Sequence, residues 1–345
     1  MSIQNKFEEF YGNIFLTNEC DEYKDARAKD DAIVEKIKNK FKANEYSVKE
    51  TFIQGSWATN TAIKQKGVDF DIDRAIVISE SDAPSDPLKP KNAILEVLEG
   101  MNFKNAKIKT PCVTAGYKNI DLHIDLPVYS KDDDGNYKLA IGKPHSQISE
   151  WGNSDPKGLI DWIKNFDAYK YNYEREHRRQ FRRLVCYIKK WRNEIFSDGI
   201  KSKLFSIGLT IMIKECFQPS IDIDGVPDDL TALKNTVSHI LFFGNYLTSD
   251  GNGGYKIKVV LPVTPYRDIY NDAGCSERGT QFYNKLSTLN DKLQDVIDES
   301  DNLKKQCEIL RKQFGDDFPI ITDDNVKKAS LGFSVAGTVG TSQGA

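Results

Sequence analysis

The segment QGSWATNTAIKQKGVDFDIDRAIVIS constrains the fold more than any other part of the chain. A Gly-Ser turn is followed by a strand-like stretch that carries three alternating carboxylates, Asp69, Asp71 and Asp73. Because successive side chains of a strand point to opposite faces, the three acids share one face, and Phe70 and Ile72 lie on the other. Three like charges in a largely buried strand are costly unless a cation neutralises them. The segment therefore predicts a strand that lines a cation site.

A second stretch, NIDLHIDLPVY, repeats this pattern with Asp121, His123 and Asp125 on one face. A solvated face of an antiparallel sheet would explain either stretch alone, but two such strands together favour a carboxylate cage. Mg²⁺ prefers oxygen ligands of this kind, and two ions can clamp the attacking and leaving oxygens of a phosphoryl transfer. For His123, a hydrogen-bonding role is favoured over proton transfer.

A phosphate-binding element is expected beside these acids, although the chain has no G-x-x-x-x-G-K loop. We expect the backbone amides of Gly55 and Ser56 and the hydroxyl of Ser56 to hold a triphosphate. The downstream segment YEREHRRQFRRLVCYIKKWRNEIF is rich in Arg and Lys. A basic helix face is usually solvated, but one that faces a triphosphate site would supply one or two phosphate ligands.

Three motifs, QGSW, DIDRAIVI and HIDLPVY, read together with RRLVCYIKKWRN, resemble the polymerase-beta-like nucleotidyltransferases. Within that superfamily the chain is most similar to the bacterial cGAS/DncV-like nucleotidyltransferases (CD-NTases) of CBASS antiphage systems. The resemblance covers about residues 45–250. It implies that Asp71, Asp73 and Asp125 are the catalytic metal ligands, for Mg²⁺ or alternatively Mn²⁺. Asp69 and Asp71 fit the same spacing, so this second pair stays open.

The same resemblance implies the substrate-binding residues. They are Gln54, Gly55 and Ser56 on the Gly-Ser turn, Lys189 on the basic segment, and Ser206 beyond it.

The pattern of apolar residues predicts an α+β fold with two lobes around an active-site cleft. We expect a nucleotidyltransferase core over 1–165, formed by a small mixed sheet with helices, a helical domain over 166–320 and a flexible tail over 321–345. Strands are predicted at 48–53, 68–78, 106–113 and 117–129, and long helices at 171–196, 203–217, 228–243 and 280–314.

Composition limits the partners and the compartment. No stretch approaches the roughly 18–20 apolar residues of a membrane span, and the first residues lack a signal-peptide pattern, so a cytoplasmic protein without membrane contact is expected. The six cysteines show no zinc-type spacing and are expected to be reduced. The net charge of −3 offers no broad basic field, so direct activation by double-stranded DNA is not expected.

The predicted function is the synthesis of a cyclic di- or trinucleotide second messenger from ATP, GTP or both, with release of pyrophosphate and Asp125 as general base. One alternative is a template-independent transferase that acts on an RNA, protein or small-molecule acceptor. The other is a non-catalytic nucleotide sensor, which would not need three costly acids.

The ending Gln343-Gly344-Ala345 follows a stretch of small residues. It resembles the flexible termini of relatives in type II CBASS operons, which an E1/E2-like ligase activates and joins to a target amine. The resemblance implies conjugation through Ala345.

Overall fold

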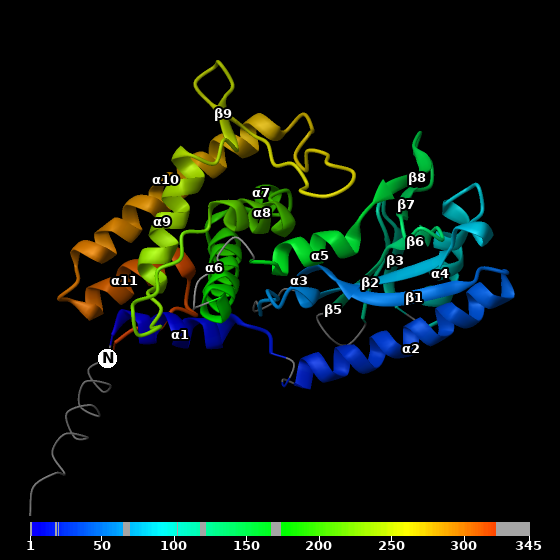
Figure 1. Ribbon diagram of the computed structural model, residues 1–345, viewed down its shortest axis with the longest axis horizontal. Helices are drawn as coiled ribbons and strands as arrows, with labels where there is room; N and C mark the ends of the chain where they lie inside the picture. The colour runs from blue at the N-terminus through cyan, green and yellow to red at the C-terminus, as the bar shows by residue number, and fades with distance from the viewer. Residues whose placement is uncertain are drawn as a thin grey trace, which may run out of the picture.

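The computed structural model describes residues 2–17, 19, 21–64, 70–101, 103–117, 122–166 and 174–321. The chain forms a sheet lobe and a helical lobe, which lie side by side in Figure 1. This arrangement confirms the predicted α+β class.

The sheet lobe is built on eight strands in the order β3-β4-β5-β2-β6-β7-β8, and β1 pairs with β2 outside this path. The strands are β1 (Val48–Gln54), β2 (Phe70–Ser79), β3 (Lys104–Ile108), β4 (Val113–Gly116), β5 (Leu122–Leu126), β6 (Val128–Lys131), β7 (Tyr137–Gly142) and β8 (Ser149–Ser154). Strand β2 runs parallel to β5 over its first half and parallel to β6 over its second half, with Pro127 at the junction. The strand that carries the acids is therefore central to the sheet.

One face of the sheet is covered by α2 (Asp21–Ala43) and α4 (Leu88–Gly100), whose apolar residues join those of β2, β4, β5 and β6 in one core. Arg74 lies on this covered face and is buried, with its guanidinium bonded to Asp30 of α2. Asp30 is fully buried, and the guanidinium of Arg74 compensates its negative charge. This contact fixes the strand directly after Asp73.

The helical lobe contains α1 (Ile3–Ile14), α6 (Glu174–Ile195), α7 (Asp198–Lys201), α8 (Ser206–Cys216), α9 (Asp229–Phe242), α10 (Cys275–Asp298) and α11 (Leu303–Phe314). Helix α1 packs here rather than on the sheet, because Phe7 and Phe10 contact Tyr187 of α6 and Phe318 near the end of the described chain. Helix α5 (Pro156–Lys164) extends between the lobes in Figure 1. The boundaries of the domains at residues 165 and 320 stay a prediction.

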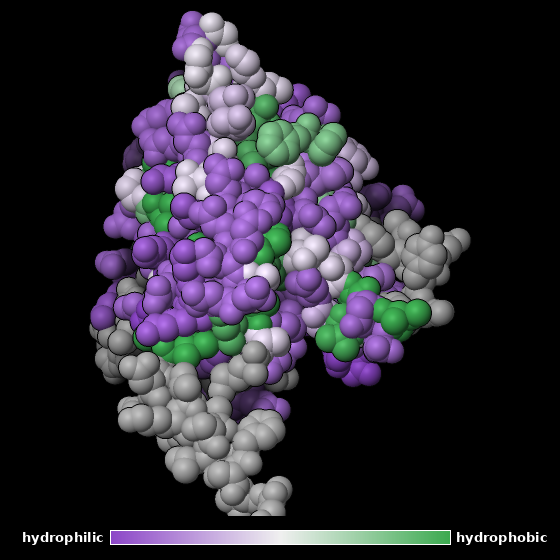
Figure 2. Space-filling view, turned by 90° about the vertical axis from the view of Figure 1, so that its left-hand side faces the viewer, coloured by the Kyte–Doolittle hydropathy of each residue, from purple (hydrophilic) through white to green (hydrophobic). Residues whose placement is uncertain are grey.

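The surface of the helical lobe in Figure 2 is mainly hydrophilic with scattered apolar patches. The apolar stripes of its helices are therefore mostly turned inward. No helix in the described ranges is both long and apolar enough to cross a membrane. The five cysteines of these ranges are free thiols, and Cys20 lies outside them.

Three predicted elements were wrong in detail. The strand expected at 106–113 is broken into β3 and β4 by a turn at residues 109–112, which the bond from the amide of Lys109 to the carbonyl of Cys112 closes. The strand expected at 117–129 is divided by Pro127, which lacks an N–H donor. The helix expected at 280–314 is two helices, and Asn302 caps the second by accepting from the amide of Lys305.

Candidate active site

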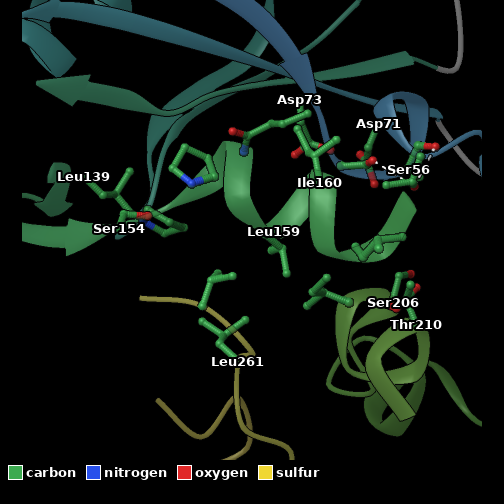
Figure 3. Close-up of a pocket in the computed structure, with 18 of the residues that line it drawn as sticks. Ser56, Asp71, Asp73, Leu139, Ser154, Leu159, Ile160, Ser206, Thr210 and Leu261 are labelled. Carbon is green, nitrogen blue, oxygen red and sulfur yellow. Dashed lines mark hydrogen bonds between the residues drawn. The ribbon is translucent and has the colours of Figure 1, made fainter. Parts of the chain in front are cut away.

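A cleft of about 1170 Å³ lies between the sheet lobe and the helical lobe. Figure 3 shows Asp71, Asp73 and Ser56 on one side of it and Ser206 with Thr210 across from them. The structure brings together seven of the predicted site residues as lining of this cleft: Gln54, Gly55, Ser56, Asp71, Asp73, Lys189 and Ser206.

The third predicted acid is placed by strand register. Asp73 of β2 lies opposite Asp125 of β5 on one side and opposite Gln54 of β1 on the other. The two carboxylates therefore stand on neighbouring strands, and Asp73 lies between Asp125 and the strand that leads into the Gly-Ser turn. Asp69 and Asp121 lie outside the described residues, so the choice between the two acid pairs stays open.

The charges of the site are unbalanced. Burial, and after it the negative charges of Asp125 and Asp71, raise the pKa of Asp73 from 3.8 to about 7, although Lys189 and Lys109 act in the opposite direction. A carboxyl with such a raised pKa is held in a place that lacks positive charge. A cation bound among these acids would supply it.

The Gly-Ser turn is shaped around Asp73. Gly55 has a φ of 64°, in the left-handed region where glycine carries no steric penalty, and begins the short helix α3 (Gly55–Ala58). Gln54 is held in place by the hydroxyl of Tyr129, which donates to its side-chain oxygen at 3.1 Å. The turn thus presents its backbone to the cleft directly above the carboxylate.

Lys189 is buried and already has partners. Its ammonium donates to the carbonyl of Thr61 at 2.9 Å and to the hydroxyl of Thr61 at 3.1 Å. Burial lowers its pKa to about 8. Lys189 therefore joins α6 to the floor of the cleft, beside its predicted role as a phosphate ligand.

Arg192 belongs to the predicted basic segment, but sequence reasoning chose Lys189 from it and did not single out Arg192, which lines the cleft one helical turn later. Its guanidinium donates to the hydroxyl of Ser206 at 3.0 Å and to the carbonyl of Leu204 at 2.7 Å. The spacing of three residues from Lys189 was the available signal, because residues at i and i+3 share one helix face. A guanidinium at this position can hold phosphate oxygens.

The apolar half of the cleft was also not foreseen. It is formed by side chains of β7, α5 and the loop after β10 (Tyr255–Ile257), namely Leu139, Ile141, Leu159, Ile160 and Leu261. Figure 3 shows Leu139, Leu159, Ile160 and Leu261 around the cavity. Apolar walls with a few polar groups are typical of sites that bind flat organic ligands.

The donor set fits a hard divalent cation. Oδ1 of Asp125 is buried and has no hydrogen-bond partner among the described residues, and the Nζ of Lys109 lies 3.6 Å from it. No group of three or more His, Cys, Asp or Glu side chains in those residues is already arranged to hold an ion. The carboxylates of Asp71, Asp73 and Asp125 are therefore of the right kind for Mg²⁺ and would have to converge on it.

Parts of the chain are similar in sequence to known proteins. Residues 1–166 match the Second Messenger Oligonucleotide or Dinucleotide Synthetase domain family. The cyclic GMP-AMP synthase of Escherichia albertii is 28% identical over 174 residues, which are 48% of this chain and 36% of that protein. The chain thus spans about a third of the length of this curated relative.

The fold as a whole is shared with solved bacterial structures. The DncV cyclic AMP-GMP synthase of Vibrio cholerae superposes with a TM-score of 0.68 over 92% of this chain and 97% of its own, at 17% identity. The CD-NTase CdnG of Bradyrhizobium diazoefficiens superposes with a TM-score of 0.65 over 96% of this chain and 98% of its own, at 14% identity. The sheet lobe thus matches the synthetase domain family, and the chain as a whole shares the fold of these bacterial nucleotidyltransferases.

Proposed function

We propose that this protein joins ATP and GTP, or one of them, into a cyclic di- or trinucleotide with release of pyrophosphate. The observation that carries the proposal is the register of three strands: Asp73, which lines the large cleft, lies between Asp125 of β5 and Gln54 at the start of the Gly-Ser turn. A relative from Escherichia albertii is named a cyclic GMP-AMP synthase. The Vibrio cholerae protein of the same fold has been solved with the linear intermediate pppA(3',5')pG.

The residues divide the work between the two lobes. The amides of the Gly-Ser turn and the hydroxyl of Ser56 hold the triphosphate from the sheet side. Arg192 and Ser206 face it from the helical side. Asp125 accepts the proton of the attacking ribose hydroxyl. Two Mg²⁺ ions, when bound, would activate that hydroxyl and stabilise the departing pyrophosphate.

The cleft also has the size that two successive transfers require. Its volume of about 1170 Å³ is above the range of roughly 300–1,000 Å³ that is usual for a site of one small ligand. The apolar side chains of β7 and α5 in the lining offer stacking surface for bases. A linear intermediate can therefore turn over without leaving the cleft.

The proposal is tested by incubation with labelled ATP and GTP and either Mg²⁺ or Mn²⁺. We expect release of pyrophosphate and a product that resists phosphatase, whose mass identifies the ring. The double variant Asp71→Asn with Asp73→Asn should remove the product and keep the fold, because the amides preserve shape but lose the ligand charge. Asp133→Asn, in an exposed surface turn, serves as the matched control. Full activity in the double variant would refute the assignment.

The same assay separates the two alternatives. A transferase that needs an RNA, protein or small-molecule acceptor would release little pyrophosphate until the acceptor is added. A sensor would bind nucleotide and release none.

We extend the proposal to antiphage defence in the cytoplasm, with an E1/E2-like ligase as a partner that conjugates Ala345. Residues 322–345 lie outside the described residues, so this conjugation stays a prediction. Co-expression with such a ligase should give a mass shift on the peptide that contains Ala345. An unmodified peptide under these conditions would contradict it.

A further inference from the structure

Lys91 of α4 is fully buried, although lysine is among the residues least often found without solvent. Its ammonium lies among four backbone carbonyls, those of Lys109 at 2.8 Å, Thr110 at 2.9 Å, Ala140 at 3.3 Å and Gly142 at 2.5 Å. No carboxylate pairs with it in the described residues. The charge of Lys91 is therefore balanced by carbonyl dipoles alone. Burying an ammonium without a paired carboxylate costs free energy, which raises the question of what this lysine holds in place.

What Lys91 holds is the turn at residues 109–112 between β3 and β4. Two of its four carbonyls belong to this turn, and the other two belong to β7. The carbonyl of Thr110 also accepts the amide of Gly142 at 3.0 Å. The lysine thus joins the turn to a strand that is not its neighbour in the sheet.

The turn reaches the catalytic site in two ways. Thr110 and Pro111 line the cleft, and Lys109 extends its ammonium to 3.6 Å from Oδ1 of Asp125. At this distance the two charges attract without a hydrogen bond. The side chain of Lys109 is also 44% exposed, so its ammonium can move away from Asp125 into solvent.

We propose that Lys91 is a positioning residue of the catalytic site: it fixes the turn at residues 109–112 so that Lys109 neutralises Asp125 until a bound cation replaces it. The inference rests on the proposed function, because it takes Asp125 as a metal ligand. On this proposal, the ammonium of Lys109 and the metal cation compete for Asp125. Lys91 determines how strongly Lys109 competes, because it fixes the turn that carries Lys109.

The test measures Mn²⁺ binding to the nucleotide-free protein by electron paramagnetic resonance, with thermal stability recorded in parallel. Lys109→Met should tighten Mn²⁺ binding about ten-fold, because a like charge near the ion is removed. Lys91→Met should act in the same direction by releasing the turn, and should add nothing in the Lys109→Met background. Lys107→Met, an exposed lysine of β3, is the matched control and should leave Mn²⁺ binding unchanged.

A purely structural role for Lys91 would lower the melting temperature and leave Mn²⁺ affinity as in the wild type, which would overturn the inference. Additive effects of the two lysine variants would overturn it as well.

If Lys91→Met does not fold, a second variant tests the same turn. Pro111→Gly loosens the turn and keeps both lysines, so it should tighten Mn²⁺ binding. An unchanged Mn²⁺ affinity in Pro111→Gly counts against the proposal. A wild-type protein that binds no Mn²⁺ at all would defeat the proposed function too, whereas normal binding with unresponsive variants defeats this inference alone.

Discussion

Gly55 lies so close to Asp73 that a Cβ atom on residue 55 would stand 2.0 Å from Oδ2 of the carboxylate. No side chain can occupy that space without displacing Asp73. The Gly-Ser turn and the catalytic acid are therefore one structural unit, since the glycine determines where the carboxylate can be.

Gly55→Ala should abolish product formation and destabilise the protein by about 1–2 kcal/mol from the left-handed backbone alone. Gly135→Ala is the matched control, because Gly135 also has a positive φ, of 90°, but its Cβ would meet only the end of Lys131 at 3.9 Å. Denaturant unfolding should show a similar loss of stability in the two variants. The pyrophosphate assay should show that activity is lost in Gly55→Ala and kept in Gly135→Ala. Equal activities in the two variants would contradict the contact.

The raised pKa of Asp73 predicts an unusual pH dependence of the metal-free protein. The folded state holds a proton on Asp73 up to about pH 7, while the unfolded chain releases it near 3.8, so this group lowers the free energy of unfolding as pH rises between these values. Asp73→Asn should remove that loss and raise the melting temperature at pH 8 in the presence of a chelator, by a few degrees for each ~1 kcal/mol. A lower melting temperature than the wild type at pH 8 would show that Asp73 is not strained by its neighbours.

The open choice of acid pair can be decided by graded loss of activity. If Asp73 is a direct ligand, Asp73→Asn should abolish product formation, whereas Asp69→Asn should cost about 10–100-fold, as for a residue that supports a ligand. Initial rates at saturating Mg²⁺ measure both. The reverse order would move the pair to Asp69 and Asp71.

The contact between Arg192 and Ser206 predicts a role in binding rather than in the chemical step. Arg192→Gln should raise the KM for the nucleoside triphosphate about ten-fold or more, the usual effect of losing a charged hydrogen bond, with a smaller change in kcat. Arg175→Gln is the control, because Arg175 is exposed on the same helix. A fall in kcat with unchanged KM would argue against phosphate binding.

Local patterns predicted the centre of the site, because alternation along a strand is fixed by backbone geometry and does not depend on the rest of the chain. Alternation predicted that Asp69, Asp71 and Asp73 share one face of a strand, whereas the choice of Asp71 and Asp73 as ligands came from the family resemblance and stays a prediction. Local patterns did not single out Lys91 or Arg192. The nearest of the four carbonyls around Lys91 lies 18 residues away, and Leu204 and Ser206 lie 12 and 14 residues beyond Arg192, so only folding brings these groups together. The same holds for α1, whose apolar spacing predicts a helix but not the lobe that it joins.

The packing of α1 has a consequence for the order in which the protein can be completed. Phe10 contacts both Phe314 and Phe318, with ring centroids 5.2 and 5.0 Å apart, yet more than 300 residues of synthesis separate it from them. While the ribosome makes the sheet lobe, the apolar side of α1 has no surface to cover it, and such exposed segments are where nascent chains aggregate or meet chaperones. The sheet lobe can mature early, but the helical lobe closes only after the chain has passed Phe318, so the cleft between them is among the last features to form.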